Sequence, residues 1–256
     1  MTTDRPVKWA GWTHPEGTVA IVTGAGSGIG EAATILAAMQ GYKVAAWDIN
    51  AEGNQRTIAR AGQYAKSILP VVVDVADKAA VERAMAETVA GLGKPKLLVN
   101  NAGPVALGRK WEFLEALDAA VGSIQKVTEA FLATEPEEGA SVVNISAVSG
   151  AITGGGFDWY ATAKAGILGY TRWCATEKAP RYRFNAIAPG GPIHTPRNDK
   201  FIDSPDMVAR IARNPMKRPG SPEELAAGIL FLWSPAASYV NGVLLVIDGG
   251  LTLTGG

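Results

Sequence analysis

The sequence predicts an α/β fold in which helices cover both faces of a parallel β-sheet. Seven short apolar runs alternate with amphipathic segments over almost the whole chain of 256 residues, and this alternation is typical of strand–helix–strand units with right-handed crossovers. Several runs are apolar on both faces, as strands buried between two helix layers are. The length suits one large domain better than two small ones, so we expect a single domain over 1–256.

The predicted elements follow one another from the first run to the last. Strands are expected at 18–23, 43–48, 68–75, 96–100, 141–146, 183–189 and 242–248. Helices are expected at 28–40, 51–61, 78–90, 113–133, 159–178 and 222–233. Residues 1–17 form a predicted N-terminal extension. The stretch 189–206 is rich in Pro and Gly, and we expect a substrate lid over about 190–213.

The composition argues against several kinds of partner. Lys plus Arg and Asp plus Glu both number 24, so the net charge gives no sign of nucleic-acid or membrane-surface binding. No apolar run reaches membrane-spanning length, and residues 1–17 lack the apolar core of a signal peptide. Cys174 is the lone cysteine, and with only His14 and His194 beside it a His- or Cys-based metal site is not expected. We therefore expect a cytoplasmic protein without a metal, which binds neither nucleic acid nor membranes.

A glycine-rich turn joins the first predicted strand to the first predicted helix. Residues 23–30 read TGAGSGIG, with glycines at 24, 28 and 30 in a GxxxGxG rather than a strict GxGxxG spacing. Glycines there let the backbone turn tightly and let a pyrophosphate approach helix N-terminal amides. A turn without a ligand is the alternative, but strand, turn and helix fall in the order that dinucleotide binding needs. The expected contacts are Gly24, Ser27, Gly28, Ile29 and Gly30.

An acidic residue ends the second predicted strand. Asp48 lies eighteen residues beyond Gly30, where a carboxylate can accept hydrogen bonds from both ribose hydroxyls of NAD and repel the 2′-phosphate of NADP. Ser27 and Ile49 stand where an NADP-binding chain would be expected to carry Arg or Lys. The alternative is that Asp48 merely caps the next helix. We predict NAD as the cofactor, with Asp48 and Ile49 among its contacts.

Further motifs follow in order. They are Asp74-Val75 at the end of the third strand, Asn100-Asn101-Ala102-Gly103 at the end of the fourth, Tyr160-Ala161-Thr162-Ala163-Lys164 at the start of a helix, Pro189-Gly190 after a strand with Ile193 and Thr195 beyond, and YVNG at 239–242 before DGG at 248–250. Together with the glycine turn, this set resembles the classical short-chain dehydrogenase/reductase family from about residue 18 to 250.

The resemblance implies a doubly wound Rossmann fold with a seven-stranded parallel sheet ordered 3-2-1-4-5-6-7. It also implies a set of cofactor contacts. Asp74 and Val75 would hold the adenine, Asn101, Ala102 and Gly103 would line the cleft with Pro189 and Gly190, and Ile193 and Thr195 would meet the nicotinamide carboxamide. The stretch between Pro189 and Thr195 is one residue longer than the family pattern, so the contact residue there stays open. Family members commonly form homodimers or homotetramers, here through the helices at 113–133 and 159–178.

Tyr160 and Lys164 carry the predicted chemistry. Their spacing of four places both side chains on one helix face. A free phenol has a pKa near ~10, and an adjacent ammonium together with the positive nicotinamide ring favours the phenolate. Lys164 would also donate to the nicotinamide ribose. We expect NAD(H)-dependent interconversion of an alcohol and a ketone or aldehyde on a small-to-medium hydrophobic substrate. Phe157 and Trp159 are candidates for an apolar pocket wall, and plain core packing is an equal alternative.

The sequence departs from the family at two positions. The family's catalytic serine normally lies thirteen residues before the tyrosine, where this chain has Ala147, and no asparagine for the family's proton relay occurs between Asn101 and Asn144. Losing one preorganised donor can cost on the order of 10²–10³ in rate. Candidates for a replacement are Ser146, which we place with Tyr160 and Lys164 in the predicted catalytic set, Ser149, Thr153, His194 or a polar group of the substrate. The alternatives are a catalytically impaired NAD-binding protein and a non-redox enzyme of lyase or isomerase type.

Overall fold

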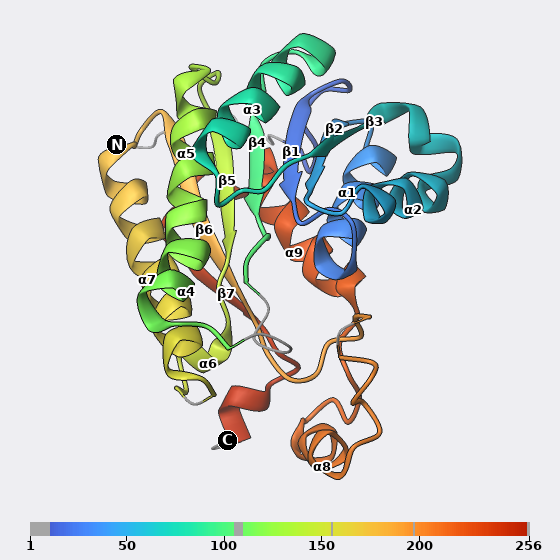
Figure 1. Ribbon diagram of the computed structural model, residues 1–256, viewed down its shortest axis with the longest axis vertical. Helices are drawn as coiled ribbons and strands as arrows, with labels where there is room; N and C mark the ends of the chain where they lie inside the picture. Colours follow the sequence, from blue (N-terminus) through green and yellow to red (C-terminus); the bar gives the residue numbers. More distant parts are fainter. Residues whose placement is uncertain (1–10, 105–109, 155, 197, 255–256) are drawn as a thin grey trace, which may run out of the picture.

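The computed structural model describes residues 11–104, 110–154, 156–196 and 198–254. Its centre is a seven-stranded sheet in the order β3-β2-β1-β4-β5-β6-β7, in which every pair of neighbours is parallel (Figure 1). The strands are β1 (Val19–Thr23), β2 (Lys43–Asp48), β3 (Ile68–Val72), β4 (Leu97–Asn100), β5 (Ala140–Ile145), β6 (Tyr182–Pro189) and β7 (Leu244–Ile247). The fold class and the strand order are those that the sequence predicted.

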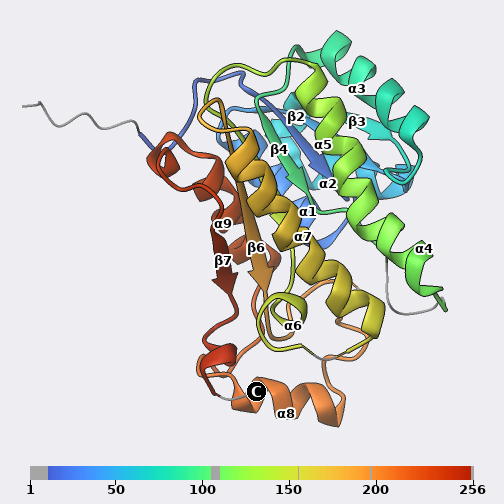
Figure 2. The ribbon, with the colours of Figure 1, turned by 90° about the vertical axis from the view of Figure 1, so that its left-hand side faces the viewer.

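Helices cover both faces of this sheet (Figures 1 and 2). One layer contains α1 (Gly28–Met39), α2 (Ala51–Ala61) and α9 (Pro222–Trp233), and the other contains α3 (Lys78–Leu92), α5 (Ser123–Ala133) and α7 (Asp158–Glu177). Successive strand residues point to opposite faces. In β1, Ala20 and Val22 accordingly pack against the α1 and α9 layer, whereas Ile21 packs against the other. The sheet is therefore buried on both faces, as the apolar runs indicated.

Buried tryptophans tie the sheet to its helix layers. The Trp47 indole N–H donates to Thr88 Oγ1 at 2.9 Å, and the Trp233 indole N–H donates to the Leu98 carbonyl at 3.0 Å. Both side chains are fully buried, and burying an indole N–H without an acceptor would cost free energy. In the described part of the N-terminal extension, His14 Nε2 lies 2.9 Å from the Trp233 carbonyl. This contact ties the extension to the end of α9.

Three elements differ from the predicted ones. The helix expected over 113–133 consists of α4 (Phe113–Leu117), a π-helical turn (Asp118–Gly122) and α5. A short α6 (Val148–Ala151) follows β5, and α8 (Pro205–Arg213) forms within the predicted lid. The start of α8 is determined locally, since Ser204 accepts a hydrogen bond from the Met207 N–H and Pro205 occupies the first turn. Figure 1 shows α8 set apart from the helix layers, beyond the carboxyl ends of the strands.

Candidate active site

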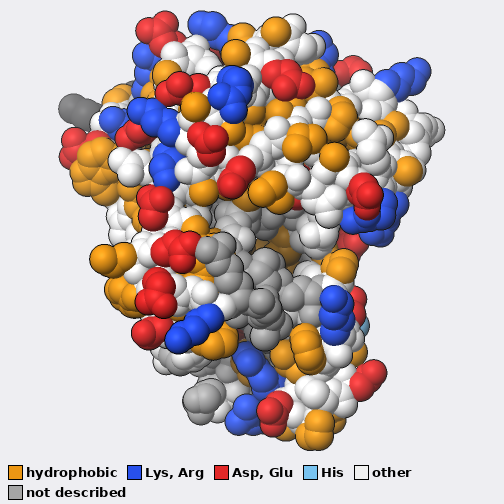
Figure 3. Space-filling model, in the orientation of Figure 1, with side chains coloured by type: hydrophobic (Ala, Val, Ile, Leu, Met, Phe, Trp, Pro, Cys, Tyr) orange, Lys and Arg blue, Asp and Glu red, His pale blue; other side chains and the backbone are white. Residues whose placement is uncertain are grey.

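A cleft of about 840 Å³ lies at the carboxyl ends of the strands, where open parallel sheets bind their ligands. Figure 3 shows the surface hollowed between the body of the sheet and the part that carries α8. All the predicted cofactor residues except Gly30 line this cleft. They are Gly24, Ser27, Gly28, Ile29, Asp48, Ile49, Asp74, Val75, Asn101, Ala102, Gly103, Tyr160, Lys164, Pro189, Gly190, Ile193 and Thr195.

The glycine turn has the open backbone that a phosphate cradle needs. Gly24 and Gly28 have φ angles of +69° and +57°, which side chains rarely tolerate. A Cβ on Gly24 would lie 2.7 Å from Asn101 Nδ2, and that amide donates to the Thr23 carbonyl at 3.0 Å. Gly30 lies outside the cleft lining, and a Cβ there would overlap the Gly24 carbonyl. In this structure Gly30 packs the helix against the turn, and the cofactor contact expected for it stays a prediction.

Asp48 is joined to the glycine turn through its carboxylate. Its Oδ2 accepts the Gly26 N–H at 2.8 Å and its Oδ1 accepts the Asn50 N–H at 2.8 Å. The N-cap of α2 is Asn50, whose side chain accepts from the Gly53 N–H at 3.0 Å, so the alternative of Asp48 as a helix cap is not what the structure shows. Ile49 beside it is 68% exposed. Each carboxylate oxygen keeps acceptor capacity toward the cleft.

Tyr160 and Lys164 lie together in the cleft. Both come from the first turns of α7, and Lys164 Nζ is 5.7 Å from the centroid of the Tyr160 ring. The Lys164 ammonium donates to the Ile145 carbonyl at 2.8 Å, which ties it to the end of β5. The lysine is thus held beside the phenol by a strand that itself ends at the cleft.

The end of β5 presents the methyl group of Ala147, at the position where the family's serine is expected from the sequence. Ala147 lines the cleft and is 6% exposed. The neighbouring Ser146 is 2% exposed, and its hydroxyl donates to the backbone carbonyl of Lys164 at 2.7 Å. Because a hydroxyl has one hydrogen to donate, this bond counts against the donor role predicted for Ser146. That role stays a prediction.

The other candidate donors differ in position. The Thr153 hydroxyl faces the carbonyls of Val148 and Gly154, and it lies outside the cleft lining. His194 is half-exposed, pairs through Nδ1 with Asp199 Oδ1 at 3.0 Å and also lies outside the lining. Ser149, in the first turn of α6, lines the cleft. In the helical stretch before β5, where the sequence contains no asparagine, Asp118 and Ala119 of the π-helical turn line the cleft.

The substrate end contains residues that no sequence motif singled out. Trp111 lines the cleft and packs against Trp159 with ring centroids 6.1 Å apart. Trp159 is buried, contacts the Tyr160 ring edge-on at 5.7 Å and lies outside the main cleft, whereas Phe157 is 53% exposed. The aromatic wall is therefore Trp111, supported from behind by Trp159. Arg210 of α8 also lines the cleft.

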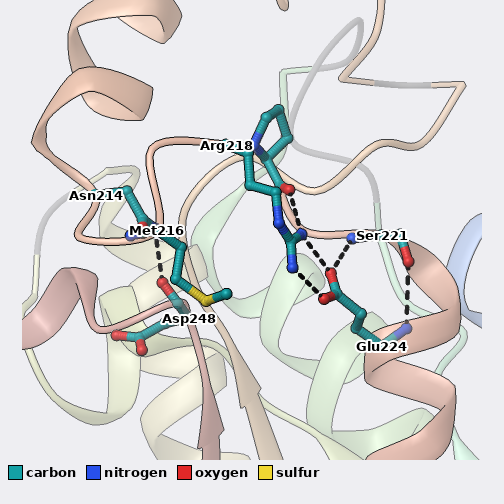
Figure 4. A network of polar contacts seen from close by, with 7 residues as sticks. Asn214, Met216, Arg218, Ser221, Glu224 and Asp248 are labelled. Carbon is teal, nitrogen blue, oxygen red and sulfur yellow. Dashed lines mark hydrogen bonds and ion pairs between the residues drawn. The ribbon is translucent and has the colours of Figure 1, made fainter.

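The carboxyl end of the lid is anchored by a polar network (Figure 4). Asn214, 3% exposed, donates from Nδ2 to the Asp248 carbonyl at 2.8 Å, directly after β7. Arg218 and Glu224 pair at 2.6 Å, and this guanidinium together with the Ser221 N–H lowers the pKa of Glu224 to about 2. The segment that follows α8 is thus attached to β7 and to the start of α9, which leaves α8 as the outer part of the lid.

Two further findings concern metals and membranes. Within the described ranges, no group of three or more His, Cys, Asp or Glu side chains could hold a metal ion. None of the helices in that part of the chain has the length and apolarity that crossing a bilayer requires.

Comparison with known proteins assigns the chain to a family. The family model described as enoyl-(acyl carrier protein) reductase, adh_short_C2, matches residues 24–252. A 3-oxoacyl-[acyl-carrier-protein] reductase of Thermotoga maritima is 36% identical over 245 residues, covering 93% of this chain and 99% of its own. This chain belongs to the classical short-chain dehydrogenase/reductase family.

Other members of the short-chain dehydrogenase/reductase family agree in sequence and in structure. Levodione reductase of Leifsonia aquatica is 35% identical over 91% of this chain and 93% of its own. A crystal structure titled levodione reductase superposes with a TM-score of 0.82 at 32% identity, covering 94% of this chain and 99% of that one. These relatives confirm the family that the motifs indicated and the general reaction class, nicotinamide-dependent oxidoreduction.

Proposed function

We propose that the protein is an NAD(H)-dependent oxidoreductase that interconverts an alcohol and a ketone or aldehyde, with Tyr160 as general acid and base. The observation that carries the proposal is one continuous cleft. Asp48 and the glycine turn line it together with Tyr160 and Lys164. The relatives support the reaction class, since their names include a 3-oxoacyl-[acyl-carrier-protein] reductase, a levodione reductase and a D-threitol dehydrogenase.

The residues present fit a nicotinamide dinucleotide. Gly24 and Gly28 have positive φ angles, which favour glycine and leave the turn without side chains at these two positions. The N-terminus of α1 adjoins the turn directly, as a pyrophosphate requires. The carboxylate of Asp48 supports NAD rather than NADP, because it would repel a 2′-phosphate and Ile49 offers no cation beside it. When bound, the coenzyme would supply hydride for carbonyl reduction or accept it in alcohol oxidation.

The chain's own residues would move the proton. In reduction, the Tyr160 hydroxyl gives its proton to the substrate oxygen as hydride reaches the carbonyl carbon. In oxidation, the phenolate takes the proton of the alcohol. Lys164 Nζ, 5.7 Å from the phenol ring, favours the phenolate by its positive charge. The Ile145 carbonyl holds that ammonium in place, so the lysine is positioned before any ligand binds.

The substrate end supports a small-to-medium hydrophobic substrate. Trp111 offers an aromatic wall there, and such side chains bury large apolar areas at low conformational cost. We also propose a cytoplasmic homodimer or homotetramer, with contacts through α4, α5 and α7. The last of these helices keeps Trp173 54% exposed, which supports a covered surface there.

Replacing Tyr160 by Phe tests the proposal. The variant removes the phenolic proton and leaves the ring, so we expect ketone reduction by NADH to fall by about 10² or more while NADH fluorescence titration gives an unchanged Kd. The absence of a serine at Ala147 favours one alternative, an NAD-binding protein without turnover. That alternative requires NADH binding with no reaction across a broad ketone and alcohol panel. Conversion of substrate without net change in NADH would instead indicate a lyase or isomerase.

A further inference from the structure

We propose that Ser149 supplies the hydrogen bond to the reacting substrate oxygen that Ala147 cannot supply. The inference rests on the proposed oxidoreductase function and assigns a catalytic residue within the same site. In it, the donor has moved two residues along the chain, from the end of β5 to the first turn of α6. Three observations carry it: the packing of α6, the bonding of the other cleft hydroxyls, and the state of the Ser149 side chain.

The packing of α6 places Ser149 next to the catalytic pair. A Cβ on Gly150 would lie 2.5 Å from both Lys164 Cβ and the Ala161 carbonyl oxygen, so α6 touches α7 at the turns that carry Tyr160 and Lys164. On its other side, Val148 reaches the Pro189–Gly190 turn, because a Cβ on Gly190 would lie 2.9 Å from Val148 Cγ1. Ser149 stands between these two contacts and faces the cleft.

The other serine and threonine hydroxyls of the described cleft lining have different surroundings. Ser146 donates to the Lys164 carbonyl at 2.7 Å. Thr195 accepts the Asn198 N–H at 3.2 Å, and its methyl group faces Gly28 of the phosphate turn. Ser27 lies within that turn itself. The Ser146 hydroxyl is thus already bonded to α7, and the hydroxyls of Thr195 and Ser27 lie at the phosphate turn.

The Ser149 hydroxyl makes no hydrogen bond to any described residue, although the side chain is partly buried in the cleft wall. A partly exposed hydroxyl that bonds no protein group keeps its hydrogen to donate to a ligand in the cleft. In carbonyl reduction, negative charge develops on the substrate oxygen until Tyr160 delivers its proton. A donor already held at that point stabilises this charge more than the neutral carbonyl, and so it accelerates the reaction.

Variants that remove the Ser149 hydroxyl or place a hydroxyl at position 147 test the inference. The variants are S149A, A147S, the double variant A147S/S149A, and T153A as a matched control that removes a hydroxyl outside the cleft. The assay is NADH-dependent reduction of acetophenone, cyclohexanone and a panel of related ketones, with NADH binding followed by fluorescence and folding by thermal melting. We expect S149A to lower kcat by about 10²–10³ with little change in the Kd for NADH.

The double variant separates a donor from a merely structural serine. We expect A147S to restore at least a tenth of the activity that S149A loses, because it places a hydroxyl where the family has one, whereas T153A should match the wild-type protein. The inference is wrong if folded S149A keeps kcat within about threefold of wild type while Y160F is inactive, a result that leaves the proposed function standing. It is also wrong if S149A loses activity that A147S does not restore. If the wild-type protein binds NADH and reduces no ketone of the panel, the inference and the proposed function both fail.

Discussion

Replacing Asp48 by Asn should weaken the coenzyme preference that we propose. The carboxylate accepts the N–H groups of Gly26 and Asn50, both at 2.8 Å, and each oxygen keeps a lone pair for a ribose hydroxyl. The amide of Asn retains one acceptor oxygen, so at least one charge-assisted bond to NAD is lost. Such a bond contributes about 1.5–3 kcal/mol, which corresponds to a roughly 10- to 150-fold weaker Kd.

The same substitution should improve NADP binding. At about 4 Å, a carboxylate repels one phosphate charge by roughly 1–4 kcal/mol, depending on the effective dielectric constant, so removing it should tighten NADP binding about fivefold or more. The ratio of the two Kd values should therefore change by about 50-fold or more. Isothermal titration calorimetry with NAD+ and NADP+ measures both values on the same preparation.

Asp77, the N-cap of α3, provides a matched control. Asp77 caps α3 through the Ala79 and Ala80 N–H groups and lies outside the cleft lining, so D77N removes an equal charge without touching the proposed ribose site. Its Kd for NAD+ should stay within about twofold of wild type. The reasoning is refuted if D48N binds NAD+ within threefold of wild type, or if the wild-type protein binds NADP+ as tightly as NAD+.

Two further predictions concern the glycine turn and acid stability. In Gly30→Ala, the added methyl group would overlap the Gly24 carbonyl, so the turn must move, and we expect NADH binding to be lost in fluorescence titration while the melting curve stays cooperative. Glu224 has its pKa lowered to about 2, first by its hydrogen bond with Arg218, so the stability it contributes is fully present above pH 4.5 and is lost as the pH falls through about 2. Urea titration measures the difference in unfolding free energy between wild type and E224Q. This difference should be small but constant from pH 5 to 7 and should vanish near pH 2. A difference as large near pH 2 as at pH 7 would contradict the assignment.

The parts of the fold that the sequence predicted well have one signal in common. Strands buried on both faces are mostly apolar, so the seven apolar runs marked them even though β5 and β6 also bury Asn144 and Asn185, and β2 begins and ends at the predicted residues. The Tyr160–Lys164 pair could also be predicted from the sequence, because a spacing of four on a helix determines which side chains share a face. These features depend on residues close together in the sequence.

The parts that were missed depend on distant partners. The lid helix α8 is amphipathic and has a local start signal at Ser204 and Pro205, but none of its residues is buried, so its place beyond the sheet does not follow from its own sequence. Trp111 lines the cleft and packs against Trp159. No sequence motif indicates this contact. The hydrogen bond of Ser146 is of the same kind, since its acceptor is a backbone carbonyl on another element. Sequence spacing placed Ser146 near the site, but only the structure shows where its hydrogen points.

The end of β5 holds α7 in position without a contact from Ala147. Asn144 donates to Thr171 Oγ1 at 2.9 Å, the Ile145 carbonyl accepts from Lys164 Nζ at 2.8 Å, and Ser146 donates to the Lys164 carbonyl at 2.7 Å. Three successive residues of β5 and its end thus hold α7 in position, and none of these contacts involves residue 147. A methyl group at Ala147 therefore leaves intact the contacts that hold the Lys164 ammonium beside the Tyr160 ring. In the proposed mechanism only the donor to the substrate oxygen comes from elsewhere, and α6, which begins at the next residue and packs on the same turns of α7, carries the proposed donor Ser149.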